Sequence, residues 1–143
     1  MSNSLRSWLQ TRVIHDADAY ARDTLGARPG GRVQIVQFLT YDGVIRATVC
    51  DKTHYITAQF AEPLVNSFRG APLRFTQLRG AYFALRSCCV AAVERGVVLD
   101  VFAADVLGGI HDPVHSDSLR SVLAMERPPA ALVAWVRDAT HRA

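Results

Sequence analysis

Two groups of side chains in this sequence could do chemistry: the histidine pair His111 and His115, and the adjacent thiols Cys88 and Cys89. Two histidines four residues apart on a helix can bind zinc. Pro113 lies between them and would interrupt that helix, so a solvated loop is the preferred interpretation. A nucleophilic cysteine needs a histidine base and an orienting partner, and no known signature surrounds either thiol. The sequence therefore indicates a protein that binds rather than catalyses, with no metal or other cofactor.

The composition predicts one globular domain spanning residues 1–143. Half of the 143 residues are hydrophobic, which is enough for a real core, and the net charge is only +3. Three cysteines form no disulfide framework and predict buried thiols in a reducing compartment. No apolar run approaches the ~20 residues that span a membrane, and the first four residues lack the features of a signal peptide. We expect a soluble, intracellular protein.

Between about residues 32 and 107 the pattern predicts short β-strands broken by one short helix. The clearest turn is Cys50–His54, which joins two segments of alternating polarity. The expected elements are strand 32–39, strand 44–49, strand 54–60, helix 62–68, a strand in two parts (73–78 and 81–93) and strand 97–107. Strand, hairpin, helix and two further strands is the order of a five-stranded oligonucleotide/oligosaccharide-binding (OB) barrel. The fold class is thus mainly β with flanking helices.

Helices are expected on both sides of the barrel. Residues 4–23 carry an apolar stripe at helical spacing that includes Trp8, Leu9 and Val13, and this helix could close one mouth of the barrel. The segment from 117 to 140 predicts two more helices, at 119–126 and 130–140. The last has an apolar stripe of Leu132, Trp135, Val136 and Ala139, which could pack on the barrel or on a partner.

Two residues have a structural interpretation. Asp51 sits in the hairpin turn, where an aspartate can accept backbone N–H groups. Trp8 is expected to pack in the core. A face for single-stranded nucleic acid would lie on the outer side of strands two and three, where Arg46 and Tyr55 are the strongest candidates. One arginine and one tyrosine form a thin platform, so direct nucleic acid binding is expected to be weak or absent.

Three motifs in order resemble a known family. They are Leu5-Arg6-Ser7-Trp8-Leu9, Thr48-Val49-Cys50-Asp51-Lys52-Thr53-His54, and Phe68-Arg69-Gly70 before Leu73-Arg74-Phe75. This arrangement is similar to the telomerase-recruiting OB domain of the shelterin telomerase-processivity protein and of the small yeast telomerase subunit behind the "ever shorter telomeres" phenotype. The resemblance runs over about residues 5–107.

The resemblance implies a non-catalytic adaptor of fungal type. Family members bind the N-terminal domain of the telomerase reverse transcriptase and promote its recruitment and processivity at telomeres in the nucleus. Other shelterin-type proteins, including the single-strand-capping protein, are implied partners. The downstream segment that binds the capping protein is not expected in this chain. No membrane partner is implied.

The resemblance also suggests a telomerase-contact patch. Arg74 matches a basic patch residue, Gln77 stands where the animal protein has an apolar one, and Glu62 matches an acid at the start of the helix. The acidic loop of the animal family is replaced by Val65-Asn66-Ser67, so the patch would also use Arg69 and the N-terminal Asn3, Ser4 and Arg6. Charge reversal at Arg74 is expected to weaken telomerase binding without unfolding the protein. The alternatives are a generic single-stranded DNA- or RNA-binding OB protein, and a structural subunit held through the Leu132/Trp135/Val136 stripe.

Overall fold

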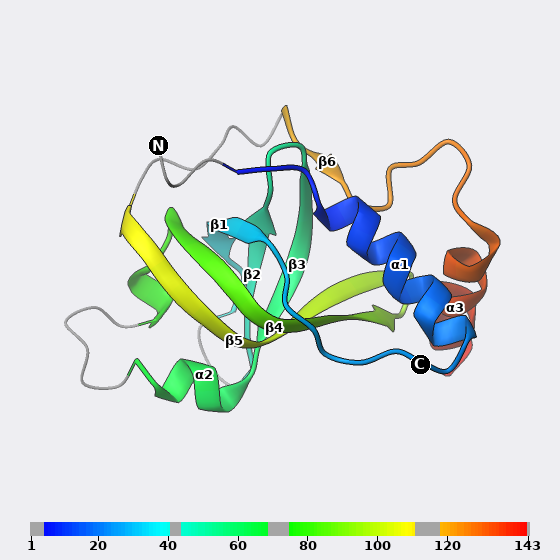
Figure 1. Cartoon of the computed structure of the whole chain (residues 1–143), viewed down its shortest axis with the longest axis horizontal. Coiled ribbons are helices and arrows are strands. Elements are labelled where there is room, and N and C mark those ends of the chain that lie inside the picture. The colour runs from blue at the N-terminus through cyan, green and yellow to red at the C-terminus, as the bar shows by residue number, and fades with distance from the viewer. Residues whose placement is uncertain (1–4, 41–43, 69–74, 111–117, 143) are drawn as a thin grey trace.

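The computed structural model describes residues 5–40, 44–68, 75–110 and 118–142 of the chain (Figure 1). Strands form a barrel on one side, and two of the helices lie together on the other side. The elements are α1 (Leu9–Ala21), β1 (Arg32–Phe38), β2 (Ile45–Cys50), β3 (His54–Phe60), α2 (Glu62–Asn66), a 3-10 helix (Phe75–Gln77), β4 (Ala81–Val93), β5 (Gly96–Ile110), β6 (Arg120–Ser121) and α3 (Ala130–Arg142).

The strand order confirms the OB topology. The sheet runs β2-β1-β4-β5-β3 and closes through β2–β3 pairing, while β6 extends it beside β3. Pairings are antiparallel except those that β3 makes with β5 and β6. A parallel closure of this kind needs a crossover between the two strands. Here α2 and the long β4 supply it. The barrel therefore has no free edge between β2 and β3.

Alternation of apolar residues on β2 and β3 predicts the core correctly. All six expected inward side chains are buried: Ile45, Ala47, Val49, Ile56, Ala58 and Phe60. On β1 the same alternation predicts Val33, Ile35 and Leu39 on one face, and for Leu39 this prediction was wrong. The register shifts between Ile35 and Gln37, which marks a β-bulge. The extra residue turns Phe38 inward, at 7% exposed, and leaves Leu39 at 45%.

The first part of the expected fourth strand was also wrong in the residues that the structure describes. Phe75–Gln77 is a 3-10 helix, and Phe75 and Leu78 are buried at the i, i+3 spacing that such a turn brings to one side. Gly80 then adopts φ 85, a conformation that a side chain disfavours, and β4 begins only at Ala81. The gain is a compact aromatic cluster, in which the Phe75 ring lies 4.8–5.9 Å from those of Phe38, Phe60, Phe68 and Phe83.

The helix expected at 119–126 is absent: β6 and turns occupy the described part of that stretch. Arg120 donates its N–H to the Thr53 carbonyl and Val122 donates to the Tyr55 carbonyl, so this segment adds to the sheet edge. The C-terminal α3 packs beside α1 (Figure 1), with the Tyr20 and Trp135 rings stacked at 5.2 Å. Leu132 and Trp135 are buried in this contact, which removes them from any external interface.

The N-terminal helix is shorter than expected, because it begins at Leu9 and ends at Ala21. Asp23 takes the left-handed conformation, φ 58, and the Thr24 N–H bonds to the Ala19 carbonyl. This is the Schellman ending, with an aspartate where glycine is usual. In the described residues no helix is long and apolar enough to cross a membrane.

Candidate functional site

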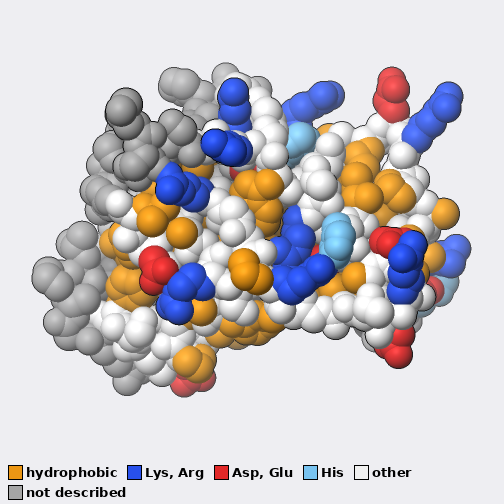
Figure 2. Space-filling model, in the orientation of Figure 1, with side chains coloured by type: hydrophobic (Ala, Val, Ile, Leu, Met, Phe, Trp, Pro, Cys, Tyr) orange, Lys and Arg blue, Asp and Glu red, His pale blue; other side chains and the backbone are white. Residues whose placement is uncertain are grey.

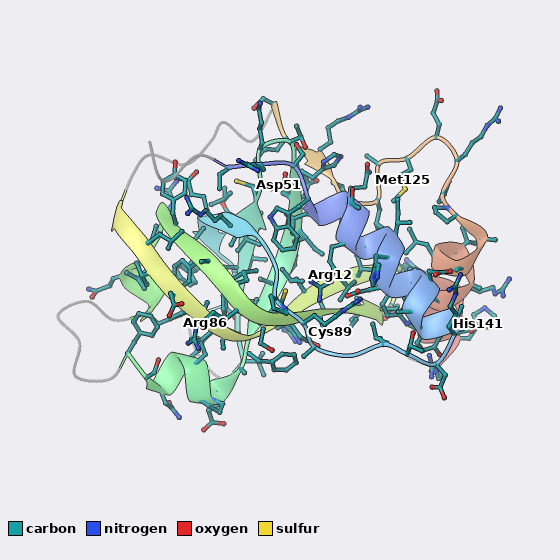
Figure 3. All side chains as sticks on the ribbon, in the orientation of Figure 1. Arg12, Asp51, Arg86, Cys89, Met125 and His141 are labelled. Atoms are coloured by element: carbon teal, nitrogen blue, oxygen red, sulfur yellow. The ribbon has the colours of Figure 1, made fainter. Side chains whose placement is uncertain are left out.

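Asp51 connects the β2–β3 hairpin to the start of α1 (Figure 3). Its side chain is fully buried, and one carboxylate oxygen accepts the N–H groups of Thr53 and His54 at 2.8 and 2.7 Å. The other oxygen accepts the N–H groups of Trp8 and Leu9 at 2.6 and 2.8 Å. Trp8 is the N-cap residue of α1 and makes no side-chain cap of its own. Asp51 therefore caps the helix from a distant part of the sequence.

Trp8 lies flat against the chain that leads into β1. Its indole Nε1 donates to the Arg32 carbonyl at 2.9 Å. A Cβ atom placed on Gly30 would lie 2.8 Å from the indole ring, and one on Gly31 would lie 2.7 Å from it. The pair of glycines thus makes room for the ring. The sequence signals a turn at these glycines, but only the structure shows which side chain requires them.

A buried ion pair lies one helical turn further along α1. Asp16 is 0% exposed and receives the Arg12 Nε at 3.0 Å and the Val90 N–H at 2.9 Å. Arg12 also donates to the carbonyls of Pro29 and Cys88, at 2.9 and 2.6 Å. This arginine therefore joins α1, the segment before β1 and β4, as its place under the helix in Figure 3 shows. This pair was not predicted from the sequence, although its i, i+4 spacing is a readable signal.

The outer face of β2 and β3 has the polar character expected for it. Arg46 donates to the Gln59 side chain at 2.8 Å, and Gln59 donates to Asp100 at 2.9 Å. These three side chains form a row across β2, β3 and β5. The row gives Arg46 a hydrogen bond to Gln59 and places the Asp100 carboxylate nearby. Tyr55 is 38% exposed on the same face. The two residues proposed for nucleic acid contact thus lie on one face, but the arginine already has protein partners.

The predicted telomerase-contact residues fall into two groups. Glu62 is the first residue of α2, and Gln77 is the last residue of the 3-10 helix. Phe75 of that 3-10 helix packs on Phe60 and Phe68, which lie just before and just after α2, so Glu62 and Gln77 form one group. Arg6 precedes Ser7, whose hydroxyl bonds to Thr53 at the other end of β3. A seven-residue strand spans about 20 Å. Asn3, Ser4, Arg69 and Arg74 lie outside the described residues.

A mixed apolar and charged surface on β4 and β5 was not identified from the sequence. Phe102 on β5 is 45% exposed. Near it, Arg86 pairs with Asp105 at 2.9 Å, and Figure 2 shows hydrophobic side chains on this side of the face. The Ala61 N–H bonds to the Val101 carbonyl, which places the start of α2 next to Phe102. We call Glu62, Arg86, Phe102 and Asp105 the β5–α2 surface.

The sequence could not reveal this surface because residues 97–107 are apolar on both faces, so alternation does not identify the outward one. The register shifts in the β4–β5 pairing, around Ser87, further obscure which residues are opposite each other. Arg86 and Asp105 become neighbours only through that pairing.

The cysteines are free thiols, with Cys50 and Cys88 buried and Cys89 partly exposed. Burial raises the pKa of Cys50 to about 11, and the neighbouring Asp51 carboxylate adds to the shift. Burial likewise raises the pKa of the Cys88 and Cys89 thiols. Such thiols are poor nucleophiles at neutral pH. Within the described ranges no group of three metal-ligating side chains occurs, and His111 and His115 lie outside them.

Comparison with solved structures identifies proteins of the same fold. No protein-family model matches the chain, and no curated protein sequence is significantly similar to it. Among solved structures, the Est3 telomerase subunit of the yeast Hansenula polymorpha is similar, with a TM-score of 0.61 and 13% identity over 94% of this chain and 85% of that chain. At this identity the likeness shows the fold. The matching structure comes from the same family that the sequence motifs resemble.

Proposed function

We propose that this protein is a non-catalytic OB-fold adaptor that binds the N-terminal domain of the telomerase reverse transcriptase. It promotes telomerase recruitment and processivity at chromosome ends in the nucleus. The observation that supports this most is the fold likeness to a telomerase subunit over 94% of the chain. The ordered sequence motifs around Trp8 and Asp51 support the same family independently of the fold.

The β5–α2 surface is the contact site that we propose. The exposed Phe102 ring is the kind of aromatic anchor that dominates protein interfaces. Arg86 and Asp105 are both more than half exposed, so their charges can be paired again with a partner at low cost. Glu62 and Gln77 of the sequence-predicted patch lie at the same end of the barrel. Arg6 lies at the other end of β3, so it would need a second contact region.

The proposed mechanism requires binding only, so no side chain of this protein has to take part in a chemical reaction. An adaptor that holds telomerase next to its DNA makes each re-engagement intramolecular, with an effective concentration that can reach roughly millimolar. A modest interface is then enough to raise the number of repeats added per binding event. The shelterin-type partners, including the single-strand-capping protein, would hold the adaptor at the telomere.

Primer extension by telomerase from the same organism tests this function. With the purified chain added, we expect longer repeat ladders and an unchanged rate of first-repeat synthesis, because the adaptor acts between repeats. An unchanged ladder at concentrations that saturate binding would refute the processivity role. Binding to the primer alone, without effect on the enzyme, would instead favour the single-stranded nucleic acid interpretation.

That alternative has one observation in its favour, the exposure of Tyr55 on the outer face of β3. Base stacking on an aromatic side chain is a common feature of OB domains. The Arg46–Gln59–Asp100 row weakens the case, since it places a carboxylate on the same face.

A further inference from the structure

A groove runs along the exposed side of α1, distant in sequence from the β5–α2 surface. Its volume is about 440 Å³, and it is open to solvent. One wall is a single face of the helix, because residues 8, 11, 12 and 15 follow helical spacing. The other wall is the Arg28–Pro29 segment. The lining residues are Ser7, Trp8, Thr11, Arg12, His15, Arg28 and Pro29.

The groove combines apolar surface with Arg28, whose hydrogen-bond donors are only partly used by the described residues. Trp8 and Pro29 supply the apolar surface. The side chain of Arg28 is 47% exposed, and one of its terminal nitrogens contacts His15 Nδ1 at 2.6 Å and Asp16 at 3.5 Å. Asp16 is already held by Arg12 and by the Val90 N–H. Its other nitrogens have no hydrogen-bond partner among the described residues, and the residue lines the groove.

The charge of the groove selects the class of occupant. Arg12 and Arg28 outnumber Asp16, and Arg28 presents a planar fork of donors that matches a carboxylate. His15 lies between the two charges, with its Nδ1 2.6 Å from a terminal nitrogen of Arg28 and 3.2 Å from an Asp16 carboxylate oxygen. A nucleic acid strand would need several cations in a row, and here one exposed arginine stands next to a buried acid. Figure 2 shows this arrangement as a small group of Lys/Arg side chains beside a histidine in the middle of the face.

We infer that this groove is a second protein-interaction site, which binds an acidic segment of a partner protein with a carboxylate on Arg28 and a neighbouring apolar side chain on Trp8 and Pro29. The inference does not depend on the proposed telomerase contact. It adds a separate surface through which the barrel can join two proteins at once.

The probe is a capped tetrapeptide of alternating leucine and glutamate, titrated into the full chain and followed by NMR. The sequence has two tryptophans, so the indole N–H signals are easily assigned. We expect a saturable shift of the Trp8 indole signal. The Trp135 signal should not move, because that ring is buried against Tyr20 and serves as an internal reference. The same peptide with glutamine in place of glutamate should bind up to about fivefold more weakly, as expected for loss of one partly exposed ion pair.

Arg28→Gln is the matched variant, since it removes the charge and keeps most of the side chain. It should weaken binding of the glutamate peptide about fivefold. Arg22→Gln is the control, because Arg22 is an exposed arginine at the other end of the same helix. Thermal melts of both variants check the fold. Equal binding of the glutamate and glutamine peptides, or an unchanged affinity in Arg28→Gln, would overturn the inference. Displacement of the peptide by an oligothymidine strand would assign the groove to nucleic acid instead.

Discussion

The carboxylate of Asp51 caps the helix that begins after Trp8, with its Oδ2 atom 2.6 Å from the Trp8 backbone nitrogen. The same side chain holds the β2–β3 turn through its other oxygen. One buried residue thus ties α1 to the barrel and shapes the hairpin. This explains why the hairpin motif and the N-terminal tryptophan motif occur together in one sequence.

Replacing Asp51 by alanine should destabilise the protein without directly altering its exposed surfaces. Four backbone N–H groups lose a charged acceptor, and those of Trp8 and Leu9 are at a helix end. A cap loss of about 0.5–2 kcal/mol and unsatisfied buried donors of about 1–3 kcal/mol together predict a loss of about 1.5–5 kcal/mol. Urea unfolding measures it. Asp105→Ala, at an exposed ion pair, should change the free energy of unfolding by less than about 1 kcal/mol. Similar losses for the two variants would contradict this role.

Gly31 and Trp8 should be energetically coupled. A Cβ on Gly31 would lie 2.7 Å from the indole nitrogen, so Gly31→Ala should cost about 1–3 kcal/mol in the normal protein. Without the indole the clash disappears, and the same change should cost almost nothing in a Trp8→Ala background. A double-mutant cycle by chemical denaturation gives the coupling. Additive losses would show that Gly31 has another reason to be glycine.

Two Arg–Asp pairs on α1 share the i, i+4 spacing but differ in burial, so they offer a matched comparison. Arg12→Met leaves the fully buried Asp16 with the Val90 N–H, the His15 contact at 3.2 Å and the longer Arg28 contact at 3.5 Å, and should cost about 3–5 kcal/mol. Arg22→Met removes the exposed partner of Asp18 and should cost less than about 0.5 kcal/mol. Both values come from the midpoints of thermal or urea unfolding. Equal effects would show that Asp16 gains little from its arginine.

The protein should lose stability in alkaline solution because of Cys50. Its pKa is raised from 9.0 to about 11, so the folded state disfavours the thiolate. The stabilising contribution is therefore complete below pH 9 and is lost as the pH rises towards 11. Urea midpoints between pH 8 and 11 measure the slope. In Cys50→Ala the fall of the urea midpoint with pH should be smaller by the contribution of this thiol. If the midpoints of both proteins fall equally with pH, other titrating groups cause the loss of stability.

Sequence patterns predicted the barrel. They failed where a bulge or a turn interrupts the alternation of inward and outward side chains along a strand. Alternation placed Ala47 and Ala58 inward because β2 and β3 pair without a break. It placed Leu39 wrongly because one bulged residue before Phe38 reverses every later side chain. The Phe75 segment has an alternating pattern, but burial of Phe75 and Leu78 together favours a 3-10 turn.

The candidate sites were harder to predict, since they depend on contacts between distant residues. The Asp51 turn could be read from the sequence, but its second role as the cap of α1 joins positions more than forty residues apart. Phe102 points outward from a strand that is apolar on both faces. The groove needs Arg28 to lie across from Trp8, which follows from the path of the chain before β1.

The central claim is that telomerase binds at the β5–α2 surface. The most direct test is the dissociation constant of the full chain with the telomerase reverse transcriptase N-terminal domain, measured by isothermal titration calorimetry. We predict that Phe102→Ala weakens binding about tenfold or more, as for an aromatic anchor at an interface centre. Tyr55→Ala, which removes another exposed aromatic ring at the opposite end of β3 from α2, should bind like the unmodified protein. No binding by the unmodified chain, or weakening by Tyr55→Ala and not by Phe102→Ala, would contradict the account.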